Sequence, residues 1–125
     1  MGKQGVFSGG LYRAGGPQPL SMREAELRRL IHKFLNRSLI VNAVTDARMV
    51  KTTSGPRWTV YPAGWPDITA SLPIISRPWG IEIKTEEGEL RESQKAMLPQ
   101  LEAAGWLISV VRSVEEVSHE LKIQL

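Results

Sequence analysis

The pattern of hydrophobic and polar positions changes between two periods along the chain, one typical of helices and the other of strands. Helical spacing predicts helices over about residues 22–36, 92–104 and 114–121. Strand-like stretches lie before, between and after them, at residues 39–44, 48–52, 57–61, 66–71, 79–84 and 106–112. This order predicts an α/β or α+β domain in which helices flank a mixed central sheet.

Local signals set the expected ends of these elements. Ser21 followed by Glu24 has the capping-box pattern, so Ser21 is the expected N-cap of the first helix. Gly105 stands where a C′ glycine ends the second helix, and Pro99 within that helix is expected to kink it. The last strand follows a helical crossover, so we expect it to join the sheet parallel to an earlier strand.

Composition favours one domain and limits its chemistry. A chain of 125 residues suits a single core, and the Gly- and Pro-rich residues 1–20 are expected to be a flexible arm before one domain at 21–125. No apolar run reaches the roughly 18–20 residues that span a bilayer, so no membrane partner is expected. The absence of cysteine fits a reducing cytoplasm. With two histidines, metal ligands would be carboxylate and carbonyl oxygens, which suit hard cations.

Charge is divided unevenly along the chain. Residues 1–60 contain ten Lys or Arg and three Asp or Glu, whereas residues 61–125 contain six and ten. Such a division is expected if one part holds a polyanion and another holds cations. Chance clustering on a solvated surface would give the same count, so charge alone does not decide.

Glu82 and Lys84 are the most informative pair. They flank Ile83 on one expected strand, so both project from the same side, where burial would be costly unless they are paired or used. A simple ion pair on an edge strand is the alternative. Asp67 can lie beside Glu82 if their strands are neighbours, and two such carboxylates repel unless a cation lies between them. Mg²⁺ accepts one or two carboxylates with water and phosphate, and Lys84 could stabilise phosphate charge.

Two helical residues can complete this site. Gln94 lies on the apolar stripe of the second helix and should have an inward hydrogen-bond partner, unless it sits at the wet end of the stripe. On the first helix, Glu24 falls roughly 50° and Glu26 roughly 110° from the centre of the apolar stripe. The angle favours Glu24 as the residue that faces the site. Its competing role is the capping box with Ser21.

These residues, in this order, resemble the VRR-NUC domain (virus-type replication-repair nuclease) of the PD-(D/E)XK nuclease superfamily. The similarity covers about residues 22–117, and it implies a restriction-endonuclease-like core with αβββαβ order. The matching motifs are Gly64-Trp65-Pro66-Asp67-Ile68, Ile81-Glu82-Ile83-Lys84-Thr85, Gln94, and Ala104-Gly105-Trp106 before the last strand.

The resemblance also implies roles. Asp67 and Glu82 would ligate Mg²⁺ or Mn²⁺ with the main-chain carbonyl of Ile83, and Glu24 would complete the acidic cluster. Lys84 would be the catalytic lysine and Gln94 its supporting glutamine. The implied activity is metal-dependent endonucleolytic hydrolysis of DNA, without a nucleotide cofactor. Stand-alone members resemble junction-resolving nucleases and can be homodimers, which points to branched DNA as the substrate.

The basic part of the chain supplies the expected phosphate contacts, which give affinity and salt dependence but no sequence choice. They are Arg28, Arg29, Lys33, Arg37, Arg48, Lys51 and Arg57. Three alternatives stay open: a sequence-specific restriction enzyme, a catalytically silent nucleic-acid-binding module of the same fold, and a structural domain whose Glu82 and Lys84 form only an ion pair. Among the tryptophans, Trp65 is the one expected to reach DNA.

Overall fold

The computed structural model describes residues 19–46, 49–58, 61–85 and 87–125. In this part of the chain it is a mixed α+β fold with three helices, a four-stranded mixed sheet and a separate two-stranded hairpin. The elements are α1 Pro19–Arg37, β2 Asn42–Val44, β3 Met49–Thr52, β4 Gly55–Trp58, β5 Ile68–Leu72, β6 Arg77–Ile83, α2 Glu92–Ala103, β7 Leu107–Val111 and α3 Val114–Gln124. No helix of the described ranges combines the length and apolar character needed to cross a bilayer.

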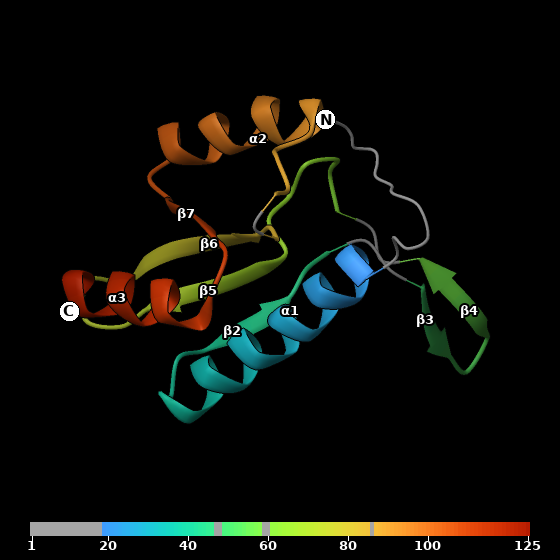
Figure 1. The fold of residues 1–125 in the computed structure, drawn as a ribbon, viewed down its shortest axis with the longest axis horizontal. Coiled ribbons are helices and arrows are strands. Elements are labelled where there is room, and N and C mark those ends of the chain that lie inside the picture. The colour runs from blue at the N-terminus through green and yellow to red at the C-terminus, as the bar shows by residue number, and fades with distance from the viewer. Residues whose placement is uncertain (1–18, 47–48, 59–60, 86) are drawn as a thin grey trace.

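The sheet has the strand order β2-β5-β6-β7 (Figure 1). β2 pairs antiparallel with β5, and β5 pairs antiparallel with β6. β7 returns through α2 and pairs parallel with β6, which confirms the prediction for the strand after the helical crossover. Ile68 of β5 lies opposite Ile81 of β6, so the next position along this ladder sets Asp67 opposite Glu82.

The helices lie on both faces of the sheet. Ile81 and Ile83 of β6 belong to the main apolar core, together with Ile31 of α1 and Val117 of α3. Since strand side chains alternate, Glu82 points to the opposite face. α2 lies on that opposite side, where its residue Gln94 is bonded to Glu82. The acidic and apolar residues of one short strand are therefore sorted into two different layers.

The first helix starts earlier than its sequence pattern suggests. α1 begins at Pro19, so Ser21 lies inside the helix and the predicted capping box with Glu24 is wrong. Proline is favoured in the first helical turn because its fixed φ suits the helix and its missing N–H is not needed there. Residues 1–18 of the expected arm lie outside the described residues.

Other boundaries shift for local reasons. The expected strand 39–44 is reduced to β2, because Leu39 adopts a φ of 61° after α1. The expected strand 57–61 begins earlier, since β4 already includes Gly55, which has a φ of 115°. Residues 59–60 of the expected strand lie outside the described residues. α2 is one helix that runs through Pro99, and Gly105 follows it with a φ of 102°, as the C′ prediction requires.

Pro66 packs directly on Gly80. Pro66 is fully buried, and a Cβ placed on Gly80 would lie 2.7 Å from Pro66 Cγ and 2.9 Å from Ile108 Cδ1. Real Cβ atoms essentially never approach so closely, and the proline ring cannot rotate away. The absence of a side chain at Gly80 therefore allows Pro66 to pack against β6. This contact fixes the chain just before Asp67.

We predict that Gly80→Ala lowers the free energy of unfolding by about 1–3 kcal/mol, because the added methyl overpacks the Pro66 contact. Urea denaturation of the two proteins measures the difference. Ser71→Ala, at an exposed position of β5, is the matched control and should change stability by less than about 0.5 kcal/mol. Equal stability of Gly80→Ala and the parent would contradict this packing.

Candidate active site

Asp67 and Glu82 bring two carboxylates together at the end of the β5–β6 ladder. Asp67 directly precedes β5, and its Oδ2 accepts a hydrogen bond of 2.8 Å from the main-chain N–H of Ile83. Because Ile83 follows Glu82, this bond holds the Asp67 carboxylate beside the Glu82 side chain. The two carboxyl groups also interact directly, and this interaction shifts the pKa of each.

The Glu82 side chain is 2% exposed, and its two carboxyl oxygens have different surroundings. Its Oε2 accepts a 2.6 Å hydrogen bond from Gln94 Nε2 and lies 3.6 Å from Lys84 Nζ. Its Oε1 is buried and has no hydrogen-bond donor among the described residues. A buried carboxylate oxygen without a donor is costly. Because the Asp67 and Glu82 carboxyls also hydrogen-bond to each other, a proton held between them meets this need, and a cation that replaces the proton would meet it as well.

Gln94 and Lys84 are the two side chains that contact Oε2 of Glu82. Gln94 is 6% exposed, and its Oε1 accepts a 2.8 Å hydrogen bond from the N–H of Arg91, which fixes the amide so that its NH₂ faces Glu82. Lys84 is 4% exposed, and its own N–H donates to the carbonyl of Val111 at 3.0 Å. The inward position of Gln94 and its polar partner agree with the prediction from helical spacing.

Electrostatics at the site are dominated by burial. Loss of solvent, together with the negative charge of Asp67, raises the pKa of Glu82 to about 8, although the ammonium of Lys84 opposes this rise. Burial also raises the pKa of Asp67, against the lowering effect of the Ile83 N–H. The buried ammonium is thus matched by more than one carboxyl group. The imbalance favours an additional positive charge, which is the proton on Glu82 when no cation is bound.

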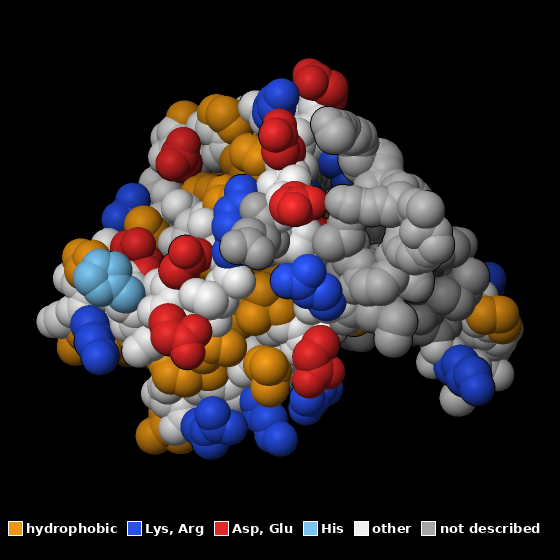
Figure 2. Space-filling model, viewed as in Figure 1, with side chains coloured by type: hydrophobic (Ala, Val, Ile, Leu, Met, Phe, Trp, Pro, Cys, Tyr) orange, Lys and Arg blue, Asp and Glu red, His pale blue; other side chains and the backbone are white. Residues whose placement is uncertain are grey.

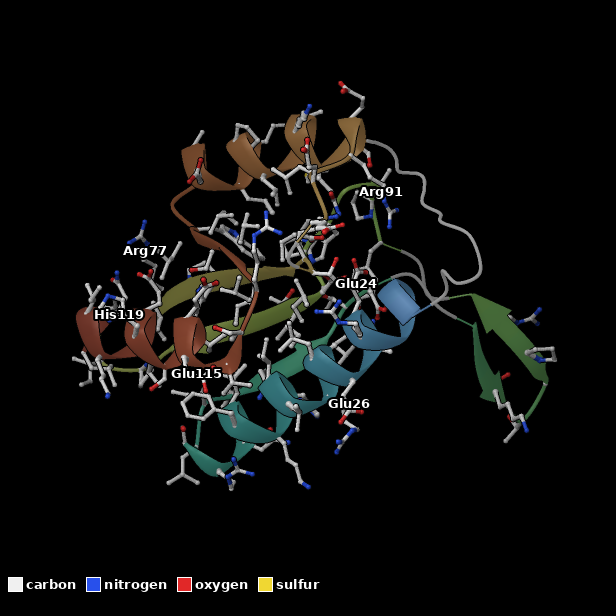
Figure 3. The ribbon with its side chains drawn as sticks, in the orientation of Figure 1. Glu24, Glu26, Arg77, Arg91, Glu115 and His119 are labelled. Carbon is white, nitrogen blue, oxygen red and sulfur yellow. The ribbon has the colours of Figure 1, made fainter. Side chains whose placement is uncertain are left out.

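Glu24 extends from α1 towards the side where α2 lies, and Glu26 extends away from it (Figure 3). Glu24 is half-buried, and its pKa is raised by burial and lowered by the charge of Lys84, with a further effect of Asp67. Glu26 is exposed and pairs with Arg29 at 2.6 Å. The helical angle that distinguished the two glutamates in the sequence therefore corresponds to their orientation in the fold.

A divalent cation fits this donor set only with ligands from outside the protein. Within the described ranges, no group of three or more His, Asp or Glu side chains is arranged to hold a metal by itself. Mg²⁺ commonly takes one or two carboxylates and completes its shell with water and substrate phosphate. Asp67 and Glu82, with the open Oε1 of Glu82, match that requirement, and Glu24 and the Ile83 carbonyl remain the predicted additional ligands.

Gly64 brings the two halves of the site together. It has a φ of 86°, and a Cβ on it would lie 2.1 Å from the carbonyl oxygen of Ser93. The loop before Asp67 therefore lies directly against the first turn of α2, next to Gln94. The glycine of the Gly64-to-Asp67 motif is thus required for both its backbone conformation and this close approach.

Several residues at the site were missed by sequence reasoning. Thr45 is buried, its N–H donates to the carbonyl of Asp67 at 2.7 Å, and its hydroxyl donates to the carbonyl of Pro66 at 2.8 Å. Asp46 raises the pKa of Asp67 and pairs with Arg28 at 3.0 Å. Arg112 donates to the carbonyls of Thr85 and Gly88, in the segment that follows Lys84. No motif marks these residues, although Thr45 and Asp46 directly follow a strand-like stretch.

The predicted phosphate contacts are spread over two surfaces. Arg28 is half-buried beside Asp46, and Arg29 pairs with Glu26. Lys33 and Arg37 are exposed along the outer side of α1, and basic side chains gather along the lower edge of the view in Figure 2. Lys51 and Arg57 are exposed on the β3–β4 hairpin. Arg48 lies outside the described residues.

The Trp65 side chain is held by contacts with other side chains of the protein. Its Nε1 donates to Thr69 Oγ1 at 3.1 Å, and its ring lies 6.3 Å from that of Tyr61 and 5.3 Å from that of Trp106. These contacts hold the Gly64-to-Asp67 loop in place. The ring is only partly exposed, so its expected contact with DNA stays a prediction.

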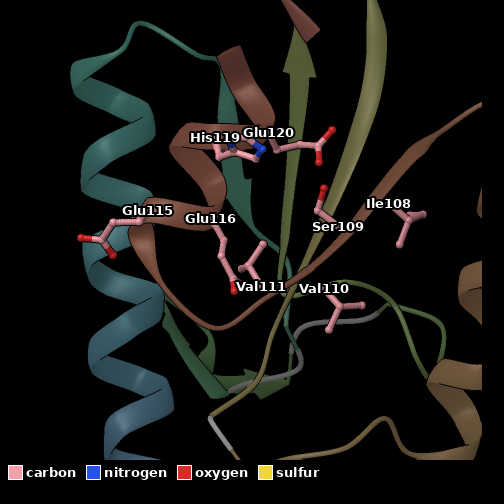
Figure 4. A pocket seen from close by; sticks show the side chains of 8 residues that line it. All are labelled: Ile108, Ser109, Val110, Val111, Glu115, Glu116, His119 and Glu120. Carbon is pink, nitrogen blue, oxygen red and sulfur yellow. The ribbon is translucent and has the colours of Figure 1, made fainter. Parts of the chain in front are cut away.

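A separate hollow of about 530 Å³ lies between β7 and α3 (Figure 4). Its lining includes Glu115, Glu116, Glu120 and His119. None of the predicted site residues lines it. Its acidic lining is unsuited to a nucleic-acid backbone, so we place no part of the candidate active site there.

No protein-family model, curated protein or solved structure matches this chain. The resemblance of the motif residues to the VRR-NUC domain therefore stays a prediction from the sequence.

We predict that, in EDTA, Glu82→Gln melts at a higher temperature than the parent at pH 8, and that the difference shrinks towards pH 4.5. The unfolded chain loses this proton near the ordinary pKa of 4.5, whereas the folded chain keeps it to about pH 8. Folding therefore becomes costlier as the pH rises between these values, and the cost is absent below them. Differential scanning fluorimetry across this range measures the effect.

The control for this titration is Glu26→Gln, which changes an exposed carboxylate whose pKa is lowered by Arg29. It should not become more stable than the parent as the pH rises. A melting difference for Glu82→Gln that stays constant between pH 5 and pH 8 would contradict a buried, proton-holding Glu82.

Proposed function

We propose that this protein is a metal-dependent DNA endonuclease of the VRR-NUC type, with a restriction-endonuclease-like core. One observation carries the proposal. Glu82 and Lys84 are buried side by side, Gln94 is bonded to the carboxylate from another element, and Asp67 is held against the same carboxylate. Ionic groups are buried in this way at a considerable cost in desolvation, which a functional site would justify.

A purely structural ion pair accounts for less of this arrangement. Lys84 alone would neutralise Glu82, and the second carboxylate beside them has no part in such a pair. Burial, together with the charge of that second carboxylate, raises the pKa of Glu82 to about 8, so the two carboxyls keep a proton at neutral pH unless a cation is bound in its place. The open Oε1 of Glu82 is likewise unexplained by an ion pair. Both features are accounted for by a hard divalent cation that completes its coordination with water and a phosphate group.

Each residue has a defined part in the proposed hydrolysis. Asp67 and Glu82 would hold Mg²⁺, for which Mn²⁺ could substitute, with Glu24 and the Ile83 carbonyl as further ligands. When bound, the metal supplies Lewis-acid stabilisation of the phosphate. Lys84 offsets the negative charge that develops on the phosphate oxygens as water attacks phosphorus. Gln94 keeps Glu82 in the orientation that presents Oε1, through its bonds to Glu82 and Arg91.

The proposed substrate is branched or junction DNA during replication, repair or recombination in the cytoplasm of a bacterial or phage-infected cell. Exposed cations on α1 and on the hairpin supply phosphate contacts without sequence choice. A homodimer would set two such sites on one branched molecule. The catalytically silent DNA-binding module is the alternative, and it differs from the proposal in one measurable result.

We predict that the purified protein cuts flap, splayed-arm or four-way DNA in the presence of Mg²⁺ or Mn²⁺ and that EDTA abolishes cutting. Glu82→Ala and Lys84→Ala should each lower the cleavage rate by at least about 100-fold, because each removes a charge that acts on the reacting phosphate. A gel assay with a linear-duplex comparison measures this. If both variants cut as fast as the parent, the assignment is wrong; DNA binding without any cutting would support the silent module.

A matched pair on α1 tests the fourth acidic residue. Glu24→Gln should lower the cleavage rate by about 10–100-fold at limiting Mg²⁺ and recover in part at high Mg²⁺, because it weakens metal affinity. Glu26→Gln removes the same charge two residues away, on the exposed side, and should cut like the parent. Titration of cleavage against Mg²⁺ distinguishes the two, and equal behaviour of the variants would exclude Glu24 from the site.

A further inference from the structure

We propose that the β3–β4 hairpin is an arm that enters the major groove of duplex DNA beside the active site. The inference rests on the proposed function, in that it assigns the arm to the same DNA molecule that the site acts on. It adds a binding element and a preference for double-stranded DNA. Neither follows from the catalytic residues.

The hairpin is structurally separate from the sheet. β3 and β4 pair with each other, with Met49 opposite Trp58 and Thr52 opposite Gly55, and in the described part of the chain neither joins the four-stranded sheet. Figure 1 shows the hairpin standing away from the sheet, beyond the N-terminal end of α1. Isolated two-stranded hairpins are only marginally stable in water. Such a hairpin adds little to the core, so a binding role explains its presence better than a packing role.

The charge of this segment is uniformly basic. Residues 47–66 contain Arg48, Lys51 and Arg57 and no Asp or Glu. Lys51 and Arg57 are exposed. Hydroxyl groups form the tip, where Thr52 Oγ1 donates to the carbonyl of Gly55 at 2.5 Å. Cations with hydroxyl groups and no carboxylates are the composition that binds a phosphate backbone.

The register of the hairpin places its cations on both faces. Lys51 is opposite Pro56, and Arg57 is opposite Val50. Paired residues share a face and neighbours alternate, so Lys51 and Arg57 lie on opposite faces of the ribbon. A ribbon that enters a groove tip first turns its two faces towards the two groove walls. Each wall carries one phosphate strand, so one cation is available for each.

The arm is tethered close to the candidate active site. Thr45 is bonded to the main chain of Asp67, and β3 begins only four residues later, at Met49. Four residues of chain span at most about 14 Å. The B-DNA major groove is about 12 Å wide and admits a two-stranded ribbon. A phosphate at Asp67 and the groove next to it are therefore both within reach of one protein molecule.

Because groove shape differs between nucleic acids, the arm should prefer duplex DNA to duplex RNA and to single strands, and this preference can be measured. The major groove of A-form RNA is deep and narrow and excludes such a ribbon. Single strands have no groove, so the arm can touch only one backbone there. The arm should therefore contribute to binding of duplex DNA and contribute much less to binding of duplex RNA or single-stranded DNA.

Equilibrium binding in EDTA tests this without cleavage. For a fluorescent DNA duplex, Lys51→Gln/Arg57→Gln should raise Kd by about tenfold or more. It should also lower the slope of log Kd against log salt concentration by about two. On the same sequence as duplex RNA, the rise in Kd should be under about threefold. Lys122→Gln, which removes an exposed cation from α3, is the control for Lys51→Gln and should bind duplex DNA like the parent.

A second measurement locates the arm directly. The chain has no cysteine, so Ser54→Cys places a single label at the hairpin tip. An environment-sensitive dye there should respond to duplex DNA at the Kd found by direct binding, and respond weakly to duplex RNA. Glu102→Cys, at an exposed position of α2, is the control label. Replacing guanine by 7-deazaguanine alters only the major-groove edge and should change the response of the dye at the hairpin tip.

The outcomes separate this inference from the proposed function. If the parent cuts DNA but the double variant binds duplex DNA as the parent does, the arm is excluded and the nuclease stands. If the parent binds duplex DNA through the arm and never cuts with Mg²⁺ or Mn²⁺, the arm stands and the nuclease falls. Equal losses on DNA and RNA duplexes would overturn the groove assignment.

Discussion

The contact between the half-buried carboxyl group of Asp67 and the buried one of Glu82 is the constraint on which the rest of this structure depends. Two acidic groups are costly to bury together, and the fold surrounds them with compensating partners: the Ile83 N–H on Asp67, and the Gln94 amide and Lys84 ammonium on Glu82. Ile83 and Lys84 are consecutive residues at the end of β6, and Gln94 comes from α2. The β5–β6 ladder, the α2 crossover and the strand β7 beside Lys84 can thus be understood as the framework that keeps these groups in place.

Two close backbone contacts fix the positions of Asp67 and Gln94 within that framework. Gly80 lets Pro66 sit on β6, and Gly64 lets the same loop touch Ser93 at the start of α2. Since neither position has room for a side chain, small changes at the glycines would be transmitted to Asp67 and to Gln94 together. The proposed chemistry therefore depends on residues that carry no functional group.

Much of this could be predicted from the sequence where the signal was periodic. Helical spacing placed Gln94 inward and distinguished Glu24 from Glu26, and the crossover predicted a parallel β7. Capping was predicted less well, because Pro19 starts α1 before the apparent box at Ser21. Thr45 and Asp46 could not be found, since their relation to Asp67 is created by β2 pairing with β5 across the intervening hairpin. Such long-range pairing leaves no local pattern in the sequence.

The position of that hairpin within the chain has an evolutionary consequence. It is inserted between β2 and β5, whose pairing does not involve it. The entropy of closing a flexible loop changes by only about 0.6 kcal/mol for each doubling of its length. The inserted segment can therefore lengthen, shorten or change composition at little cost to the sheet. Selection can alter it independently of the buried carboxylates, so the two parts of the molecule are free to diverge at different rates.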